Sequence, residues 1–294
     1  MQNQIKPFIK WAGGKQKLLQ NIRTTYPEKI VRYCEPFVGG GAVLLDVLAN
    51  HHPQNVLIND INPELINAYI QVQKSPEDLI QSLHQLENCF LNAEPDTRKQ
   101  IYLEKRNRFN ALLSHSGNQY AIEKASLFIF LNKTCFNGLY RVNQKGEYNV
   151  PMGRYKTPCI CDAHNLMNVS RALRNAEIRC GDYSQCLDFI DRNTFVYLDP
   201  PYRPLSDTAS FTAYSPDKFQ DAEQIALKKF IDRITEKGAK FTASNSDPRN
   251  SNDNDDFFDN LYQNYHIRRI IAKRTISCKG AERGDVSELL ICNG

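Results

Sequence analysis

The first third of the chain carries apolar runs in a strand, helix, strand order. A short β-prone run covers 31–37 and ends at three glycines, residues 42–49 have helical apolar spacing, and a second apolar run covers 55–59. A helix between two strands carries the chain back to the side of the sheet where the first strand began, so the second strand runs in the same direction. This order therefore predicts a parallel α/β unit.

The middle of the chain has the pattern of helices followed by a loop. Leu79, Leu83 and Leu86 lie at helical spacing, and residues 121–131 form another helical candidate. The polar and aromatic stretch 132–157 then contains glycines and prolines that would break a helix. This stretch is therefore expected to be a long loop.

The last third returns to short apolar runs around one helical segment. A helix is expected over 224–234. The strand candidates are 178–180, 195–198, 241–243 and 289–291. These runs predict that the chain returns to the α/β pattern of its beginning.

The simplest architecture is one α/β domain interrupted by an inserted, mainly helical domain. The expected divisions are 1–68 and 169–294 for the two parts of the α/β domain, and 69–168 for the insert. With 294 residues, of which 41% are hydrophobic and 24% charged, the chain can bury a large core.

Charge, hydropathy and cysteine spacing exclude several classes of protein. No apolar run is long enough to span a bilayer and residues 1–10 lack the apolar core of a signal peptide, so a cytoplasmic protein without membrane contact is expected. The net charge of +4 permits a polyanionic partner without requiring one. The nine cysteines and six histidines show no metal-ligand spacing, so no metal site is expected.

The run Asp199, Pro200, Pro201, Tyr202 directly follows the strand candidate 195–198. In an open α/β sheet ligands bind beyond the carboxyl ends of strands, so a carboxylate here is well placed for function. The prolines remove two N–H donors and leave nearby carbonyls without partners. Asp199 and the Pro200 carbonyl can then accept the two N–H groups of an aromatic amine, while Tyr202 stacks on the ring. The alternative is a surface turn.

A glycine-rich turn at 37–41 separates the first strand candidate from the following helix. Such a turn lets a ligand approach the backbone closely. Asp60 follows about 20 residues later at the end of the next strand, where an acidic residue binds ribose hydroxyls in nucleotide sites. The two features indicate a ligand that carries adenosine, although many glycine-rich turns only redirect the chain.

Two further segments carry candidate chemistry. Trp11, the only tryptophan, precedes Gly13, Gly14 and Lys15, which suggests an aromatic wall and a cation for a carboxylate, although a lone tryptophan is more often part of a core. The stretch 133–156 has five basic residues against one acidic residue, with aromatic residues between them. Such a segment suits phosphates and guanine edges, and the alternative is a solvated charged loop.

Together these motifs resemble the Dam-type DNA adenine-N6 methyltransferases, the D12 class. Their order along the chain is that of the alpha group: cofactor motif, target-recognition insert, then Asp-Pro-Pro-Tyr. The resemblance spans nearly the whole chain and is closest to the restriction-companion enzymes that modify GATC, on segments 136–143, 148–155 and 199–214. It implies a Rossmann-like, S-adenosylmethionine-dependent methyltransferase sheet with an inserted DNA target-recognition domain.

The resemblance also implies roles for individual residues. The target amine would be bound by Asp199, Pro200, Pro201 and Tyr202. The cofactor would be bound by Trp11, Lys15, Phe37, Gly39, Gly41, Asp60, Asp182 and Asp199. DNA would be bound by Lys10, Phe136, Asn137, Leu139, Arg141, Pro151 and Tyr155, with Phe136 wedged into the base stack.

The resulting expectation is a site-specific DNA adenine methyltransferase that uses S-adenosylmethionine on double-stranded DNA. An adenine inside a duplex cannot reach Asp199, so the base must be flipped out, and segment 204–215 is expected to order over it. The resemblance further implies GATC as the site, functional pairing with a restriction endonuclease of the same specificity, and a monomer.

Three other functions are weighed against this one. Related sites methylate structured RNA or a protein amide, but the basic insert with GATC-type residues argues against those substrates. A DNA-binding module that has lost catalysis is disfavoured because Asp199 and Trp11 are present. A dinucleotide dehydrogenase is disfavoured because only a glycine-rich turn supports it.

Overall fold

The computed structural model describes residues 5–115, 117–203, 219–272 and 286–294. The chain divides into two compact units. Unit 1 comprises Met1–Gly14, Val38–Asn50 and Asn59–Asp182, and unit 2 comprises Lys15–Phe37, His51–Ile58 and Tyr183–Gly294. The division into an α/β domain and an insert at 69–168 stays a prediction.

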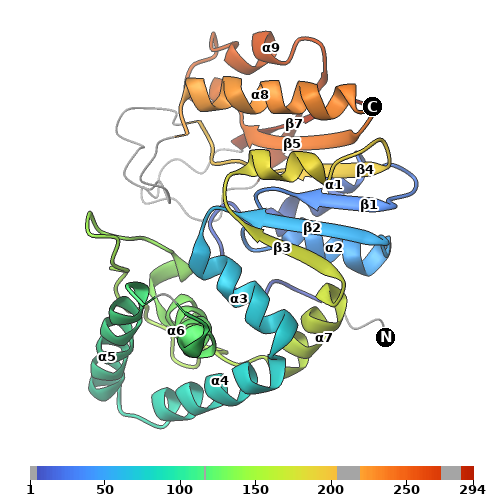
Figure 1. Cartoon of the computed structure of the whole chain (residues 1–294). Coiled ribbons are helices and arrows are strands. Elements are labelled where there is room, and N and C mark those ends of the chain that lie inside the picture. Colours follow the sequence, from blue (N-terminus) through green and yellow to red (C-terminus); the bar gives the residue numbers. More distant parts are fainter. Residues whose placement is uncertain (1–4, 116, 204–218, 273–285) are drawn as a thin grey trace. The chain divides into compact units, whose positions relative to one another are not determined.

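A seven-stranded sheet with the order β3-β2-β1-β4-β5-β7-β6 organises the fold (Figure 1). Its strands are β1 (Arg32–Glu35), β2 (Asn55–Asp60), β3 (Ala176–Cys180), β4 (Thr194–Leu198), β5 (Lys240–Ser246), β6 (His266–Ala272) and β7 (Val286–Cys292). β1 pairs in parallel with β2 and β4, β4 pairs in parallel with β5, and β7 pairs antiparallel with β5 and β6. The order reverses at β1 and β4, as in Rossmann-type sheets, so the predicted fold class is confirmed.

The core of unit 2 holds the end of β4 in place. All five residues of β4 are buried, and Val196 and Leu198 pack in one cluster with Phe241 of β5. The helix α8 (Asp221–Glu236) adds Leu227, Phe230, Ile231 and Ile234 to this cluster. Figure 1 shows α8 running beside β5. The residue that follows Leu198 is therefore attached to a fully packed strand.

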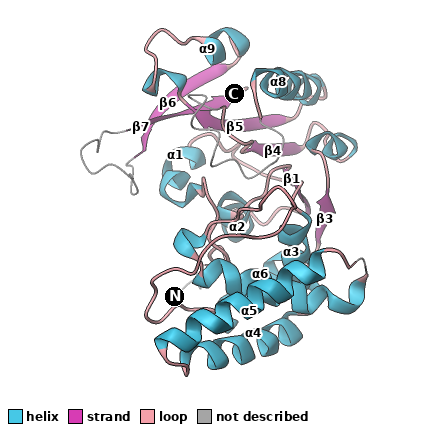
Figure 2. Cartoon of the chain, turned by 90° about the vertical axis from the view of Figure 1, so that its left-hand side faces the viewer, coloured by secondary structure: helices cyan, strands magenta, loops and turns pink. Residues whose placement is uncertain are grey.

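Unit 1 contains a helical layer built around one central helix. Residues 125–132 of α6 (Ala121–Thr134) are all buried, which is expected of a helix covered on every side. The helices α3, α4 and α5 contact it, and Figure 2 shows α4, α5 and α6 together. Each of these three begins with a proline, at Pro63–Lys74, Pro76–Leu91 and Pro95–Leu113, where the missing N–H costs nothing.

The remaining helical elements are shorter. The α-helices are α1 (Leu19–Arg23), α2 (Ala42–Asn50), α7 (Ala163–Leu173) and α9 (Phe257–Leu261). Short 3₁₀ helices occur at Lys15–Leu18, Asn118–Tyr120, Phe136–Gly138, Tyr183–Asp188 and Pro248–Asn250. Among the helices of the described ranges, none combines the length and hydropathy needed to cross a membrane.

The stretch after α6 is more ordered than the predicted loop. Antiparallel bridges join Cys135 to Met152 and Val142 to Tyr148. The second bridge closes a short hairpin, residues 141–149, whose turn is completed by the Gly146 N–H donating to the Asn143 carbonyl at 2.9 Å. The strands of this hairpin are too short to produce an alternating pattern in the sequence, which explains why a loop was expected.

Candidate active site

Asp199 is fixed at the carboxyl end of β4 by two neighbours. Its Oδ2 atom lies 2.8 Å from Nζ of Lys15, and its Oδ1 atom accepts a 2.8 Å hydrogen bond from Oγ of Ser244 in β5. The Lys15 side chain is only 4% exposed, whereas that of Asp199 is 22% exposed. A carboxylate offers about four lone-pair sites, so these contacts orient Asp199 and leave acceptor capacity for a ligand.

Tyr202 is anchored at its hydroxyl rather than on its ring. The hydroxyl donates a 2.7 Å hydrogen bond to Oε2 of Glu288, and Nζ of Lys15 lies 4.9 Å from the ring centroid. Burial, with the charges of Asp199 and Glu288, raises the pKa of Tyr202 well above its ordinary value. The ring is therefore neutral and held at one end, as a stacking platform requires.

The backbone around the two prolines differs from expectation in one respect. The Pro201 carbonyl accepts a 3.3 Å hydrogen bond from Nε2 of Gln224, so it is not left without a partner. Beyond Tyr202, Arg203 binds Oδ1 of Asp221 at 2.6 Å and Oδ2 of Asp255 at 2.7 Å. The segment 204–215, expected to order over a bound base, lies outside the described residues.

In unit 1 the glycine-rich turn and Asp60 are in direct contact. Gly39 has a left-handed φ of 47°, and its N–H donates to Oδ2 of Asp60 at 3.0 Å. Oδ1 of Asp60 accepts from the Asn62 N–H at 3.0 Å. Burial raises the pKa of Asp60, although the backbone hydrogen bonds from Asn62 and Gly39 oppose this. The carboxylate thus keeps lone pairs for hydroxyl groups of a ligand.

Trp11 lies against this glycine-rich turn. A Cβ atom added at Gly39 would lie 2.9 Å from Cδ1 of Trp11, so a side chain cannot be accommodated there. Added at Gly41, whose φ is 70°, it would collide with the Tyr69 hydroxyl. Trp11 also stacks on Tyr140, with ring centroids 5.8 Å apart. The structure therefore brings together Trp11, the glycine-rich turn and Asp60, three of the predicted cofactor-binding features.

The other two predicted cofactor residues, Asp182 and Phe37, follow the ends of β3 and β1. Asp182 comes directly after Gly181, whose N–H donates to the Asp60 carbonyl at 3.1 Å. Phe37 packs against the Tyr183 ring in unit 2, with centroids 5.3 Å apart. Asp182 and Tyr183 are adjacent along the chain, one in each unit.

The predicted DNA-binding residues gather in unit 1. Nζ of Lys10 lies 4.0 Å from the centroid of the Tyr155 ring. The Phe136 N–H donates to the Pro151 carbonyl at 2.9 Å. Phe136 is 51% exposed, an unusual position for a large apolar side chain and one that suits insertion between bases. Asn137, at φ 55°, is also exposed.

The side chain of Asn132 joins Lys10 to this cluster. Its Oδ1 atom accepts from the Lys10 N–H at 2.8 Å, and its Nδ2 atom donates to the carbonyls of Lys10 and Gly138 at 2.8 and 3.0 Å. Leu139 lies next to Gly138, and its carbonyl accepts from the Tyr148 hydroxyl at 3.1 Å. No sequence pattern marked Asn132, Ser244 or Glu288 as site residues, because an isolated polar residue in a helix or strand has no recognisable spacing.

The sheet order and the acidic turn after β4 define the chain as a Rossmann-like α/β enzyme. The D12 class N6 adenine-specific DNA methyltransferase family matches residues 11–276. The chain belongs to this family, and it is an adenine-specific DNA methyltransferase. The predicted family and enzyme class are thereby confirmed, and the other functions weighed above are not those of the family.

Relatives of similar length extend across the whole chain. It is 45% identical over 296 residues to the type II methyltransferase M.MjaIII of Methanocaldococcus jannaschii, with 99% of each protein covered. It is 36% identical to the type II methyltransferase M1.LlaDCHI of Lactococcus lactis subsp. cremoris, covering 98% of this chain and 95% of the relative. It is 35% identical to the DNA adenine methylase of Vibrio cholerae, covering 97% and 95%.

Proposed function

We propose that the enzyme transfers a methyl group from S-adenosylmethionine to N6 of an adenine flipped out of duplex DNA, within GATC. The observation that carries this is the Asp199 carboxylate, held at the end of β4 by Lys15 and Ser244. The N6 amine is a poor nucleophile because its lone pair is delocalised into the ring. A fixed acceptor for one N–H favours the tetrahedral amine and aims its lone pair at the electrophile.

The residues of the glycine-rich turn suit an adenosine-bearing cofactor. The Asp60 carboxylate accepts from backbone N–H groups that include those of Gly39 and Asn62, and its about four lone-pair sites leave room for a ribose hydroxyl. Gly39 and Gly41 keep the backbone bare of side chains. When bound, S-adenosylmethionine supplies an electrophilic methyl group. The residues proposed to hold it are Trp11, Lys15, Phe37, Gly39, Gly41, Asp60, Asp182 and Asp199.

The target base is proposed to be held by the Asp-Pro-Pro-Tyr segment. Asp199 and the Pro200 carbonyl accept the two N6 hydrogens, and the Tyr202 ring stacks on the adenine. Phe136 fills the space that the flipped base leaves. In this arrangement Asp199 and Pro200 accept hydrogen bonds from the amine, and Tyr202 only stacks on the base. The raised pKa of Tyr202 keeps its hydroxyl protonated, so the neutral side chain is the form proposed to act.

Site recognition is assigned to the segment around the hairpin. Lys10, Asn137, Leu139, Arg141, Pro151 and Tyr155 are proposed to contact DNA. Two relatives named type II methyltransferases support a partnership with a restriction endonuclease, and one named DNA adenine methylase supports the adenine target. We propose a cytoplasmic monomer. When the enzyme is expressed in a host that lacks adenine methylation, sequencing of modified bases should show N6-methyladenine within GATC. N6-methyladenine in a different sequence would reject GATC as the site but not the proposed reaction.

Removing either Trp11 or Asp60 should weaken cofactor binding. Trp11→Ala removes the ring that lies on Gly39, and Asp60→Ala removes the acceptor for ribose hydroxyls. We expect Asp60→Ala to bind S-adenosylmethionine at least about tenfold more weakly by calorimetry, since a lost hydrogen bond to a charged group costs roughly 1.5–3 kcal/mol. Trp11→Ala should also bind it more weakly, because the cofactor loses an aromatic contact surface. Nonspecific DNA affinity should stay unchanged. Unaltered cofactor affinity in both variants would remove them from the site.

The raised pKa of Asp60 predicts how cofactor binding responds to acid. The ionised carboxylate is the form that accepts from two hydroxyls, and protonation removes it. As pH falls, affinity should therefore be lost at a higher pH than an ordinary aspartate would give. Calorimetric titrations from about pH 8 to about pH 4 would measure this. Asp60→Asn should give a flatter profile, and identical profiles would contradict the assignment.

A further inference from the structure

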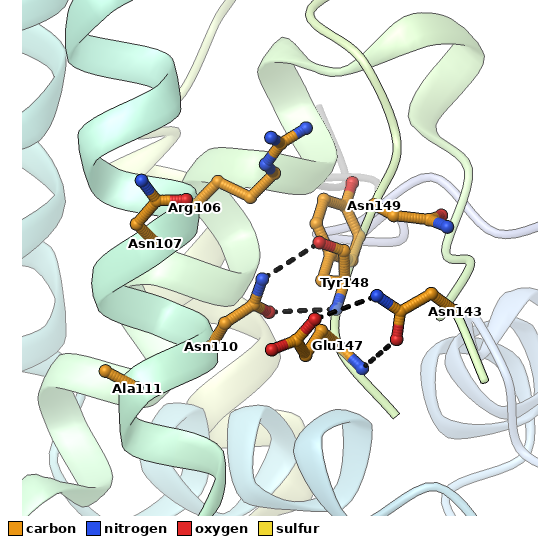
Figure 3. Close-up of a pocket in the computed structure, with 8 residues that line it drawn as sticks. All are labelled: Arg106, Asn107, Asn110, Ala111, Asn143, Glu147, Tyr148 and Asn149. Carbon is orange, nitrogen blue, oxygen red and sulfur yellow. Dashed lines mark hydrogen bonds between the residues drawn. The ribbon is translucent and has the colours of Figure 1, made fainter. Parts of the chain in front are cut away.

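The side chain of Asn110, on α5, binds the backbone of the 141–149 hairpin. Figure 3 shows Asn110 projecting from α5 toward the hairpin, with Tyr148 opposite. Nδ2 of Asn110 donates to the Tyr148 carbonyl at 3.0 Å, and Oδ1 of Asn110 accepts from the Tyr148 N–H at 2.8 Å. The amide thus satisfies both backbone groups of one residue, as a neighbouring β-strand would.

Tyr148 is fixed by its side chain as well. Its ring is buried and packs edge-on against Phe109, the residue before Asn110, with centroids 6.0 Å apart. Its hydroxyl donates to the Leu139 carbonyl. The hairpin therefore has a defined position relative to α5, although its own backbone pairing is a single bridge, between Val142 and Tyr148.

From Tyr148 the contacts continue to Arg141. The Asn149 N–H donates to the Arg141 carbonyl at 3.1 Å. The Arg141 Nε donates to Oδ1 of Asn149 at 2.8 Å, and its Nη2 reaches the Asn149 carbonyl at 3.4 Å. Within the described ranges Nη1 has no partner. Asn149 thus binds the guanidinium along its Nε edge. The edge formed by Nη1 and Nη2 stays available for a bidentate contact with a base.

We propose that Asn110 is a positioning residue for base recognition, which acts through Tyr148 and Asn149 on Arg141. This inference rests on the proposed role of Arg141 as a reader of guanine. Bidentate recognition needs a guanidinium held close to its productive orientation, and a displacement of about 1 Å can cost about 100-fold. Without Asn110 the hairpin loses two hydrogen bonds to α5, both at the Tyr148 backbone, and Arg141 spends less time aligned.

The test measures discrimination rather than activity alone. The ratio of kcat/KM on a GATC duplex to that on a duplex altered at the first base is determined for wild type, Asn110→Ala and Asn107→Ala. Asn107 lies on the same helix and lines, with Asn110 and Tyr148, the pocket drawn in Figure 3. Within the described ranges none of its polar atoms bonds to the hairpin. We expect Asn110→Ala to lower the ratio about 5-fold to 50-fold and Asn107→Ala to leave it within about twofold.

The double variant separates positioning from general damage. If Asn110 acts through Arg141, then adding Asn110→Ala to Arg141→Ala should not lower the ratio further. A purely structural Asn110 would reduce rates on both duplexes equally and leave the ratio unchanged, which would overturn the inference while Arg141→Ala still lowered it. If Arg141→Ala itself kept full discrimination, the base-reading proposal would fail first.

A second variant keeps the inference testable if Asn110→Ala folds poorly. Asn110→Asp has the same shape and retains the acceptor for the Tyr148 N–H, but it loses the donor to the Tyr148 carbonyl. We expect it to lower the ratio too, and to speed amide hydrogen exchange across 141–149 relative to Asn107→Ala. Wild-type discrimination with wild-type exchange in Asn110→Asp would overturn the inference.

Discussion

Replacing Asp199 by alanine is expected to lower the rate of methyl transfer by at least about 100-fold, the loss typical when a fixed polar contact to the reacting group is removed. The variant loses the acceptor for the N6 amine. It also takes away a partner of the buried Lys15 ammonium, which lies 2.8 Å from Oδ2. Some loss of stability is therefore expected in addition to the loss of rate.

Asp199→Asn separates the two effects. It keeps the shape of the side chain and one oxygen acceptor, so the fold should be retained while turnover stays low. Asp232→Asn is the matched control, because Asp232 also pairs with a lysine, Lys228, in unit 2 but lies on α8. Single-turnover rates and thermal unfolding would be measured for all three. Turnover near the wild-type rate in both Asp199 variants would reject the assigned mechanism.

Arg141→Ala is expected to cost on the order of 1–3 kcal/mol of discrimination at the guanine of the site. Arginine offers two parallel donors that match O6 and N7 of guanine, and the Asn149 contacts leave the end of this guanidinium accessible. Turnover would be compared on GATC and on duplexes altered at the first base. Equal losses on every duplex, with the site preference unchanged, would assign Arg141 to phosphate contact instead.

Lys145, in the turn of the same hairpin, is the natural comparison. Its exposed position suits contact with phosphate rather than with a base edge. Lys145→Ala should therefore weaken binding to all sequences and reduce the salt dependence by about one unit of slope, without changing the preferred site.

The strands of the sheet were largely predictable because parallel strands are buried on both faces. The expected runs 55–59 and 195–198 are within one residue of β2 and β4. β6 and α5 were not predicted. β6 begins with His266 and contains two arginines, so no apolar run marks it, and α5 carries charged residues around most of its surface. Only packing against neighbouring elements makes these segments regular.

Some contacts of the candidate site could also be predicted from the sequence, and others could not. Contact between Asp60 and the glycine-rich turn follows from the order strand, turn, helix, strand, which brings consecutive strand ends to one edge. The partners of Asp199 and Tyr202 do not follow from any local pattern, because Lys15, Ser244 and Glu288 lie 45 to 184 positions away. Arg141 was expected on an adaptable loop, and the structure places it on a hairpin held by Asn149.

Methyl transfer to adenine N6 in duplex DNA can be measured with a labelled cofactor. The purified enzyme is incubated with S-adenosylmethionine labelled on its methyl group and a duplex that contains a single GATC. The DNA is then digested to nucleosides, which are separated and identified by mass. We expect label in N6-methyladenine, none in a duplex whose target adenine is replaced, and almost none with Asp199→Asn. Label in another base, or no transfer to DNA by the folded enzyme, would contradict it.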